Sequence, residues 1–533
     1  MRSSSELRDP LHQVSGPATA WTTVNAAEAM PGVLTPLGIS FWLPACELGL
    51  RAAFRDFGVL APAQVRVPES VDDRISGVFH GRYAANLDVL RAMADLTPGS
   101  SGDQMERQLF GSVREGVQRN SSKRRYPVVA VKAPRAVATL PKQLRAATAT
   151  ADAAWRSLVA AAGRDAPAVG LLAQAEHNVT ASLRTHMLAT MLGQAAFDNL
   201  TKLAARAGRP GLELSLAGGY GPLEETRLVA GLWAVRDGTQ TLEAFVHEFG
   251  FHGPDEGELS SVSWREDAAP VRALVESFRG LAESSRPEVI SRERMAAREQ
   301  AEADLLAALP RATRGAARLI LRFGRTYLPM REVSKANFLK GIDSARAVSR
   351  AIGRELHRHG KLDAPDDVFY LTVEEVMGLP DNARELVTFR RERRTEYLTL
   401  QLPELWVGAP PGISTEPDLA PSDGVVRGIA AGQGQVTGRV RIIADIGTDE
   451  LLPGEVLVCA TTDPSWAAAF PLACAVVIDV GGVMSHGAIV AREFGIPCVI
   501  NTRTGTRELA TGDLVTVDGT AGTVTLLERA LSV

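Results

Sequence analysis

The spacing of hydrophobic residues divides the chain into a long N-terminal part and a shorter C-terminal part. In the first part, apolar residues recur every three or four positions, which places them on one face of an α-helix. Thr372-Val373-Glu374-Glu375 forms a capping box, which predicts a short helix that ends near Gly378. Longer helices are predicted over ranges rich in Ala, Leu and Arg, namely 139–162, 167–207, 241–250, 268–283, 287–308, 311–352 and 383–401.

After residue 424 the pattern changes to short runs of β-branched and other apolar residues. These runs predict strands over 425–429, 438–443, 456–458, 475–478, 499–500, 514–517 and 523–526. Residues 408–424, between the two parts, are rich in proline and glycine, which predicts a flexible linker. We therefore predict a multidomain chain with a large, mostly α-helical domain over 21–407 and a small α/β (β/β/α) domain over 425–533. Residues 1–20 are predicted to be a disordered tail.

Composition narrows the class of protein without identifying a function. The 533 residues are too many for one core, and 45% hydrophobic and 23% charged residues are ordinary for a globular protein. A net charge of −4 gives no reason to expect nucleic acid or an acidic membrane surface as a partner. No apolar run approaches the length of a membrane span, and no signal pattern opens the chain, so we expect a cytoplasmic protein. Four scattered cysteines are expected to be reduced thiols.

One histidine stands at the start of a predicted helix. The apolar strand over 475–478 leads into Gly481 and Gly482, and His486 then opens a helix that ends before Pro497. The apolar positions of this helix can pack, whereas Arg492 and Glu493 are expected to face solvent.

The chemistry of this position suits phosphoryl transfer. Imidazole has a reference pKa near ~6.5, so at neutral pH most of it is an uncharged nucleophile. A helix N-terminus favours an attached anion, and the preceding glycines let a phosphate donor approach the backbone. His486 is therefore suited to carry a phosphoryl group covalently, with Ser485 as the N-cap of the helix. The alternative is a histidine that only happens to begin a helix.

The segment from Gly481 to Pro497 resembles the phosphohistidine motif of the swivelling domain in phosphoenolpyruvate-utilising enzymes. That family includes pyruvate phosphate dikinase, phosphoenolpyruvate synthase and the rifampin phosphotransferases. The similarity extends to residues 462–466 and 511–519. Met484 stands where the dikinases carry a regulatory threonine, which argues against dikinase-type regulation. The resemblance implies that His486 carries the phosphoryl group and that Gly481, Gly482, Ser485 and Arg492 support it.

The helical part resembles the region between the two catalytic domains of rifampin phosphotransferase-type proteins, on residues 31–37, 81–86, 108–111, 248–256, 264–267, 331–332 and 366–371. In that family the region is helical and holds the phosphoryl acceptor. The resemblance implies acceptor-side roles for His252, Glu256, Arg331 and Glu332. The family has a histidine–arginine pair where this chain has Phe251-His252, so the acceptor chemistry is expected to be altered.

Each acceptor-side residue also has a plainer interpretation. His252 could take the proton of an acceptor hydroxyl, and Glu256 could act similarly, but both could equally belong to a structural loop. The Arg331 guanidinium suits a phosphate or phosphohistidine, although an ion pair with Glu332 along a helix would explain it too. His247 and His252 lie five residues apart, where two zinc ligands on one helix face need four, so we predict no metal site.

The family's phosphoryl donor is an upstream ATP-grasp domain, and no segment of this chain matches it or a Walker-type glycine loop. We therefore expect no cofactor on this chain, with ATP and Mg²⁺ bound by a separate ATP-grasp subunit. The expected function is a phosphotransferase component that moves a phosphoryl group from that subunit, through His486, to a hydroxyl of a small-molecule alcohol. The alternative is a non-catalytic binding or regulatory remnant of such an enzyme.

Overall fold

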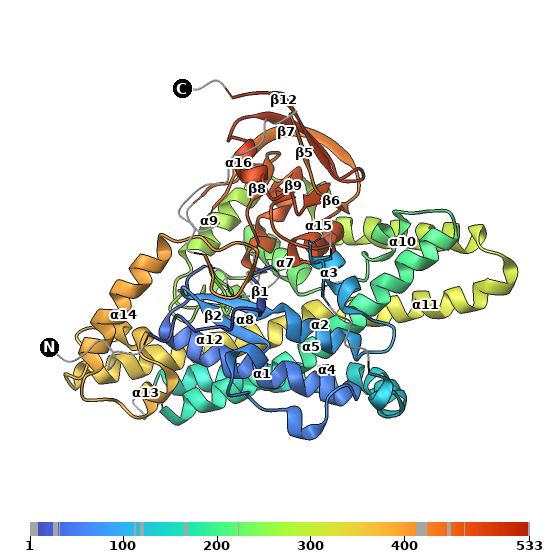
Figure 1. The fold of residues 1–533 in the computed structure, drawn as a ribbon. Helices are drawn as coiled ribbons and strands as arrows, with labels where there is room; N and C mark the ends of the chain where they lie inside the picture. Colours follow the sequence, from blue (N-terminus) through green and yellow to red (C-terminus); the bar gives the residue numbers. More distant parts are fainter. Residues whose placement is uncertain are drawn as a thin grey trace. The chain divides into compact units, whose positions relative to one another are not determined.

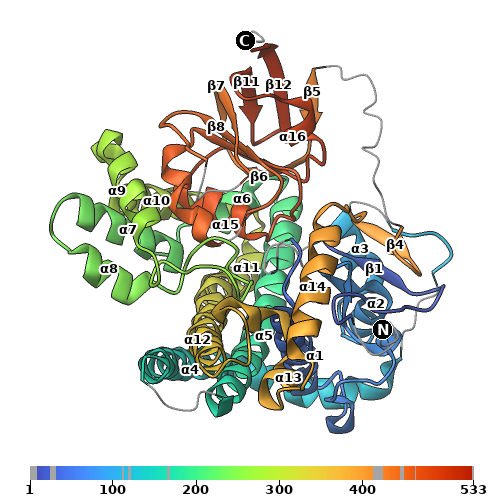
Figure 2. The ribbon, with the colours of Figure 1, turned by 90° about the vertical axis from the view of Figure 1, so that its left-hand side faces the viewer.

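The computed structural model describes residues 9–24, 30, 32–110, 113–117, 122–164, 169–221, 223–411, 424–444, 449–462 and 464–530. The chain divides into two compact units, and its elements can be followed by colour in Figures 1 and 2. The first unit comprises residues 1–188, 255–261 and 334–417. The second comprises residues 189–254, 262–333 and 418–533. The unit boundaries at 188/189 and 333/334 fall inside helices α5 (Val169–Arg206) and α12 (Met330–Arg358).

The first unit is mostly helical, as the spacing of apolar residues predicts. Helix α1 begins after Thr35, whose side chain accepts a hydrogen bond from the Gly38 amide and so satisfies one of the amides at the helix start. The capping box at Thr372 is present and opens α13. The further helices of this unit are α1 (Pro36–Phe57), α2 (Leu87–Asp95), α3 (Gly102–Phe110), α4 (Tyr126–Ala162), α13 (Val373–Met377) and α14 (Ala383–Leu398).

A four-stranded antiparallel sheet in the first unit was not predicted. Its order is β2 (Ser76–Phe79), β3 (Arg82–Asn86), β1 (Ala20–Thr22) and β4 (Leu405–Val407). The strands are three to five residues long, and β1 pairs with β4 from the far end of the unit. Pairing between such distant short segments leaves little local pattern in the sequence.

The prediction of a disordered tail over residues 1–20 is wrong for residues 9–20. Leu11 is fully buried, and the Gly16 amide donates hydrogen bonds to both carboxylate oxygens of Asp72. Residues from Ala20 onward enter the sheet as β1. These hydrogen bonds and strand pairings hold residues 9–20 against distant parts of the first unit, which their composition did not indicate. Residues 1–8 lie outside the described residues.

The second unit contains helices as well as the C-terminal strands. One predicted helix, 311–352, is two helices, α11 and α12, because Pro329 lies between them and proline disfavours helix continuation. The first of the two is α11 (Arg314–Tyr327). Three further helices lie in predicted ranges, namely α8 (Leu242–Phe249), α9 (Ala269–Ser277) and α10 (Pro287–Ala308). Two helices of this part, α6 (Leu212–Leu216) and α7 (Glu224–Arg236), lie outside every predicted range.

The C-terminal part forms an eight-stranded sheet, which confirms the predicted α/β domain. The central strands β7, β8, β9 and β10 are parallel neighbours, whereas the outer pairs are antiparallel. Figure 2 shows these strands as one orange and red group. In sheet order the strands are β5 (Val425–Arg427), β12 (Thr523–Glu528), β11 (Leu514–Asp518), β7 (Gln435–Ile442), β8 (Val456–Cys459), β9 (Ala475–Ile478), β10 (Cys498–Ile500) and β6 (Ile429–Gly432).

The C-terminal domain and helices α7 to α9 share one hydrophobic core. Trp233, Phe245 and Phe249 of the helices belong to the same buried cluster as Trp466 and Phe470 of the C-terminal domain. The compact units therefore do not follow the predicted boundary between the helical domain and the small domain. Most of the predicted linker, residues 412–423, lies outside the described residues. No helix in the described part of the chain is long and apolar enough to cross a membrane.

Candidate functional site

His486 is the first residue of helix α15 (His486–Phe494), which connects the parallel neighbours β9 and β10. Ligand sites of parallel α/β sheets form beyond the carboxyl ends of the strands, which is where this helix begins. A Cβ atom on Gly487 would meet Ile478 Cδ1 at 2.4 Å, so a larger residue here would require the Ile478 side chain of β9 to shift. The Ser485 hydroxyl accepts a hydrogen bond from the Ala488 amide and caps the helix as predicted.

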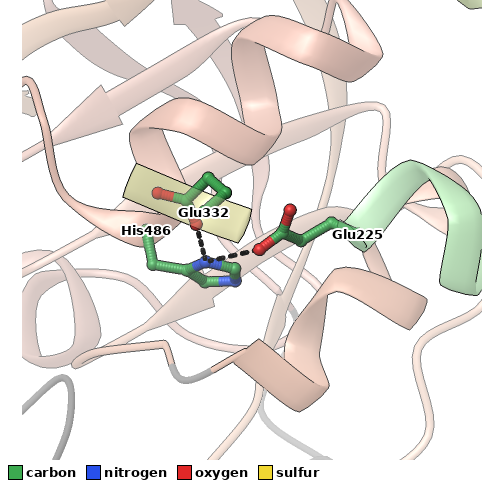
Figure 3. A group of neighbouring side chains, drawn as sticks. All are labelled: Glu225, Glu332 and His486. Atoms are coloured by element: carbon green, nitrogen blue, oxygen red, sulfur yellow. Dashed lines mark ion pairs between the residues drawn. The ribbon is translucent and has the colours of Figure 1, made fainter. Parts of the chain in front are cut away.

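Two carboxylates face the His486 ring from other helices. Figure 3 shows that Glu332 and Glu225 both face the Nδ1 atom of the ring. Nδ1 lies 3.6 Å from Glu332 Oε2 and 3.8 Å from Glu225 Oε1. The histidine is fully buried, and the two carboxylate side chains are 1% and 9% exposed. At these distances the pairs interact electrostatically, and weak solvation makes that interaction stronger than at a surface.

All three residues lie in the first turn of a helix. Glu225 is in the first turn of α7, Glu332 in that of α12, and His486 opens α15. Helix N-termini carry a partial positive charge, which stabilises carboxylates and other anions nearby. The site therefore combines two acidic groups with three helix ends that favour negative charge.

Arg331 and Glu332, both predicted on the acceptor side, lie at His486. The Arg331 Nη1 atom donates a hydrogen bond to the carbonyl of Met484, two residues before the histidine. The same atom lies 3.5 Å from Glu332 Oε1, while the other carboxylate oxygen faces His486. Arg331 thus contacts both the loop that carries His486 and one of the carboxylates that face it.

Glu225 was missed by the sequence analysis. It follows Glu224 in the first turn of α7, where acidic residues are common for reasons of helix stability alone. Nothing in its local sequence distinguishes it from other such residues. Only packing of α7 against the C-terminal domain brings it to a histidine 261 positions further along the chain (486 minus 225).

Arg492 supports the loop before His486, but from a buried position. The sequence predicted that Arg492 and Glu493 face solvent, and this is wrong: each is 6% exposed. Arg492 Nη1 donates to the Val483 carbonyl at 2.8 Å and to the Ala431 carbonyl at 3.3 Å. Burial lowers the pKa of Arg492 to about 10. The predicted glycine pair lies in the same loop, where the Ser485 amide donates to the Gly482 carbonyl at 2.7 Å; Gly481 precedes this turn.

Glu493 of α15 is hydrogen-bonded to the loop before α7. Both of its carboxylate oxygens accept from the Gly219 amide at 3.2 Å. A Cβ atom on Gly219 would meet the Arg294 carbonyl at 2.4 Å, so this close approach also requires glycine. Burial raises the pKa of Glu493 to about 7.

The raised pKa of Glu493 predicts a pH-dependent stability. Between its ordinary value of 4.5 and about 7, the folded chain keeps a proton that the unfolded chain has lost. The contribution of Glu493 to the free energy of unfolding is fully present below its ordinary pKa of 4.5 and is lost as the pH rises through about 7. We expect Glu493→Gln, which has no proton to lose, to be more stable than the native chain at about pH 8, by up to about 3 kcal/mol. The two should be similar at about pH 4.5.

Urea unfolding of the native chain and the variant at both pH values measures this difference. Glu299→Gln is the matched control, because its side chain on α10 is 63% exposed. An equal stability difference at the two pH values would contradict the assignment of a buried, protonated Glu493.

His252 and Glu256, the other two residues predicted on the acceptor side, are also buried. His252 is 3% exposed, and its ring centroid lies 4.1 Å from that of Phe251 and 5.7 Å from that of Trp264. Glu256 belongs to the first unit, where its backbone carbonyl accepts from Arg346 Nη2 at 2.5 Å. The acceptor-side roles of both residues stay predictions.

A cavity of about 460 Å³ lies beside the loop that holds His252. Its volume is in the range of small-molecule sites, and its lining mixes apolar surface with a few polar groups. Trp264, whose ring neighbours His252, contributes to the wall. Other lining residues are Pro254, Leu274, Leu451, Ser465 and Leu472.

Two family models match separate parts of the chain. Residues 451–522 match the mobile domain of PEP-utilising enzymes, and residues 142–332 match the fourth domain of rifampicin phosphotransferase. The first match contains His486, and the second contains Glu225, Arg331 and Glu332. The elements that form the candidate site therefore come from both matched regions.

Several curated proteins are similar to parts of the chain. An uncharacterized protein of Mycobacterium tuberculosis (strain ATCC 25618 / H37Rv) is 43% identical over 38% of this chain and 23% of its own length. A rifampicin phosphotransferase of Streptomyces sviceus is 29% identical over 57% of this chain and 36% of its own. The prodigiosin synthesizing transferase PigC of Serratia marcescens is 30% identical over 53% and 32%. The matched part thus spans about a quarter to a third of these relatives.

Proposed function

We propose that this chain carries a phosphoryl group on His486 to a small-molecule hydroxyl, since separate parts of it match the mobile domain of PEP-utilising enzymes and the fourth domain of rifampicin phosphotransferase. One observation supports this more than any other. The histidine of the mobile domain lies at a helix start and faces two carboxylates of the helical part, 3.6 and 3.8 Å from its Nδ1. This arrangement joins a nucleophile and potential bases in one buried site.

In the first half-reaction, we propose Nε2 of His486 as the nucleophile. In the docked arrangement the carboxylates face Nδ1, so Nε2 is the ring nitrogen that can carry the phosphoryl group into that arrangement, and in a neutral ring Nε2 attacks through its lone pair. Attack on a phosphorus atom of the donor nucleotide forms an N–P bond, while the P–O bond to the leaving phosphate breaks. The phosphohistidine so formed keeps the phosphoryl group reactive for the second transfer.

In the second half-reaction, the acceptor hydroxyl attacks the phosphorus and the N–P bond breaks. We propose that Glu332 takes the hydroxyl proton, with Glu225 supporting it electrostatically, because Glu332 is the carboxylate nearer to the His486 ring and a positioned base assists such a step. The Arg331 guanidinium, which contacts both Glu332 and the His486 loop, suits the charge of the moving phosphoryl group. His252, beside the cavity of about 460 Å³, is proposed to contact the acceptor.

The burial of His486 supports a swivelling mechanism. A fully buried ring cannot meet a nucleotide, so the C-terminal domain must leave helices α7 and α12 to be phosphorylated. In the docked arrangement the same burial excludes water, which protects the phosphohistidine from hydrolysis. The predicted linker over 408–424 would supply the required travel, since 17 extended residues reach roughly 50–60 Å.

We further propose that ATP and Mg²⁺ bind to an ATP-grasp domain on a separate chain. Calorimetry of this chain with Mg²⁺–ATP should then show no binding at micromolar concentrations, because its sequence contains no nucleotide-binding loop of the Walker type. A rifampicin phosphotransferase that includes its ATP-grasp domain is the positive control. Micromolar binding to this chain alone would contradict the separate donor.

The proposed function is tested with labelled ATP. The chain is incubated alone, with an isolated ATP-grasp domain, and with that domain and candidate alcohols. We expect acid-labile label on the chain only when the ATP-grasp domain is present, and loss of that label to a suitable alcohol. A chain that binds alcohols but never takes up label would instead be the non-catalytic remnant.

A further inference from the structure

We propose that Glu225, Glu332 and His486 form a binding site for a divalent transition-metal ion of the zinc class. Each residue offers one ligand atom, and the three atoms lie within 4.8 Å of one another. The sequence analysis predicted no metal site, because the spacing of His247 and His252 does not suit two zinc ligands on one helix face. The three residues all belong to the second unit and come from three different helices (Figure 3).

The distances between the ligand atoms suit a small cation. Ligands of a tetrahedral zinc ion lie about 2.1 Å from the metal, and two such ligands are about 3.4 Å apart. The Nδ1 atom of His486 lies 3.6 Å from Glu332 Oε2 and 3.8 Å from Glu225 Oε1. A shift of a few tenths of an ångström would bring all three atoms to coordination distance.

The ligand types favour zinc over magnesium. Imidazole nitrogen suits zinc, copper and nickel, whereas magnesium prefers oxygen ligands alone. One histidine and two carboxylates would leave a fourth position for water, as in zinc sites that have three protein ligands.

The charge balance of the site also permits a cation, at moderate affinity. Two carboxylates and a neutral imidazole carry a charge of about −2, which a divalent ion neutralises. The positive charge of Arg331 would repel the ion, but its guanidinium pairs with Glu332 Oε1, whereas Glu332 Oε2 is the oxygen that faces His486. Arg492 and the three helix N-termini oppose it as well. We therefore expect a Kd on the order of micromolar rather than nanomolar.

A bound ion would connect α15 of the C-terminal domain to α7 and α12. It would hold the docked arrangement and withdraw electron density from the His486 ring, which slows attack by Nε2. This consequence rests on the proposed function, whereas binding of the ion does not. Zinc would then inhibit phosphorylation of His486, and a chelator would reverse the inhibition.

The test uses the full chain after treatment with a chelator. Calorimetry with Zn²⁺ should show one site that His486→Gln and Glu225→Gln each weaken on the order of 100-fold, since one of three protein ligands is lost. His247→Gln is the matched control, because this exposed histidine of α8 is outside the site and its loss should leave the affinity unchanged. Co²⁺ should show the visible absorption of a four-coordinate ion, and His486→Gln should abolish it.

A crystal of the native chain with Zn²⁺ keeps the proposal testable if the variants do not fold. Anomalous scattering at the zinc edge should place the ion between Glu225, Glu332 and His486. An ion found only elsewhere, equal affinity in the folded variants and the native chain, or no binding at millimolar Zn²⁺ would each overturn the proposal. Since no phosphoryl transfer is measured, none of these results depends on the proposed function.

Discussion

Replacing His486 by alanine is expected to abolish the incorporation of acid-labile phosphate into the chain. His486 is the residue that opens α15 at the end of β9, and its Nδ1 faces Glu225 and Glu332. Without the imidazole there is no atom to form the N–P bond, so the expected effect is complete loss. The measurement is labelled phosphate retained on the chain after incubation with ATP and an ATP-grasp domain, with acid lability distinguishing phosphohistidine from phosphoserine.

His247→Ala is the control for this experiment. It removes an exposed histidine of α8 and should retain normal labelling. Incorporation of acid-labile phosphate into His486→Ala at the native level would show that another residue is the carrier. Circular dichroism of both variants establishes that the fold is intact.

Replacing Glu332 by glutamine is expected to slow transfer to the acceptor by about 10²–10⁴-fold, the usual contribution of a general base. Glutamine keeps the shape of the side chain but cannot take the hydroxyl proton. In the proposed mechanism phosphohistidine forms with the C-terminal domain away from α12, so the rate of that step should change little. Glu225→Gln should have a smaller effect, because Glu225 lies further from Nδ1 and its side chain is more exposed.

Single-turnover kinetics separates the two steps. The pre-formed phosphohistidine is mixed with acceptor, and its decay is compared between the native chain and each variant. Glu224→Gln is a matched control in the first turn of α7, since its carboxylate pairs with Arg227 at 3.0 Å. Native discharge by Glu332→Gln, or an equal loss in both half-reactions, would contradict a role as base.

The shared core between the C-terminal domain and helices α7 to α9 constrains the proposed swivelling motion. Moving the domain away would expose apolar side chains such as Trp466 and Phe470, which costs roughly 1.5–3 kcal/mol for each large side chain that becomes solvated. The docked arrangement is therefore expected to be the resting one. Undocking then requires compensating contacts, which binding of an ATP-grasp domain could provide.

Local sequence patterns were sufficient for the longer helices after residue 139 and for the C-terminal strands, but helices α1, α2, α3, α6 and α7 lie outside every predicted range. Helix ranges such as 287–308 follow from the three- and four-residue spacing of apolar positions, and the C-terminal strands follow from short β-branched runs. Both signals are local, because they reflect which face of an element is buried. The N-terminal sheet escaped prediction, because its strands are short and β1 pairs with a strand from the far end of the unit.

The sequence by itself determined the fold class, the position of His486 at a helix start and the cap by Ser485, since all three depend on neighbouring residues. Only the tertiary structure decided that Glu225 and Glu332 meet this histidine and that Arg492 and Glu493 are buried. All nine residues of α15 are buried, because the helix packs between the sheet and other helices. The spacing of apolar residues within the helix cannot indicate neighbours that come from distant parts of the chain. The partners of a buried charge come from distant segments, so they become visible only when those segments are packed together.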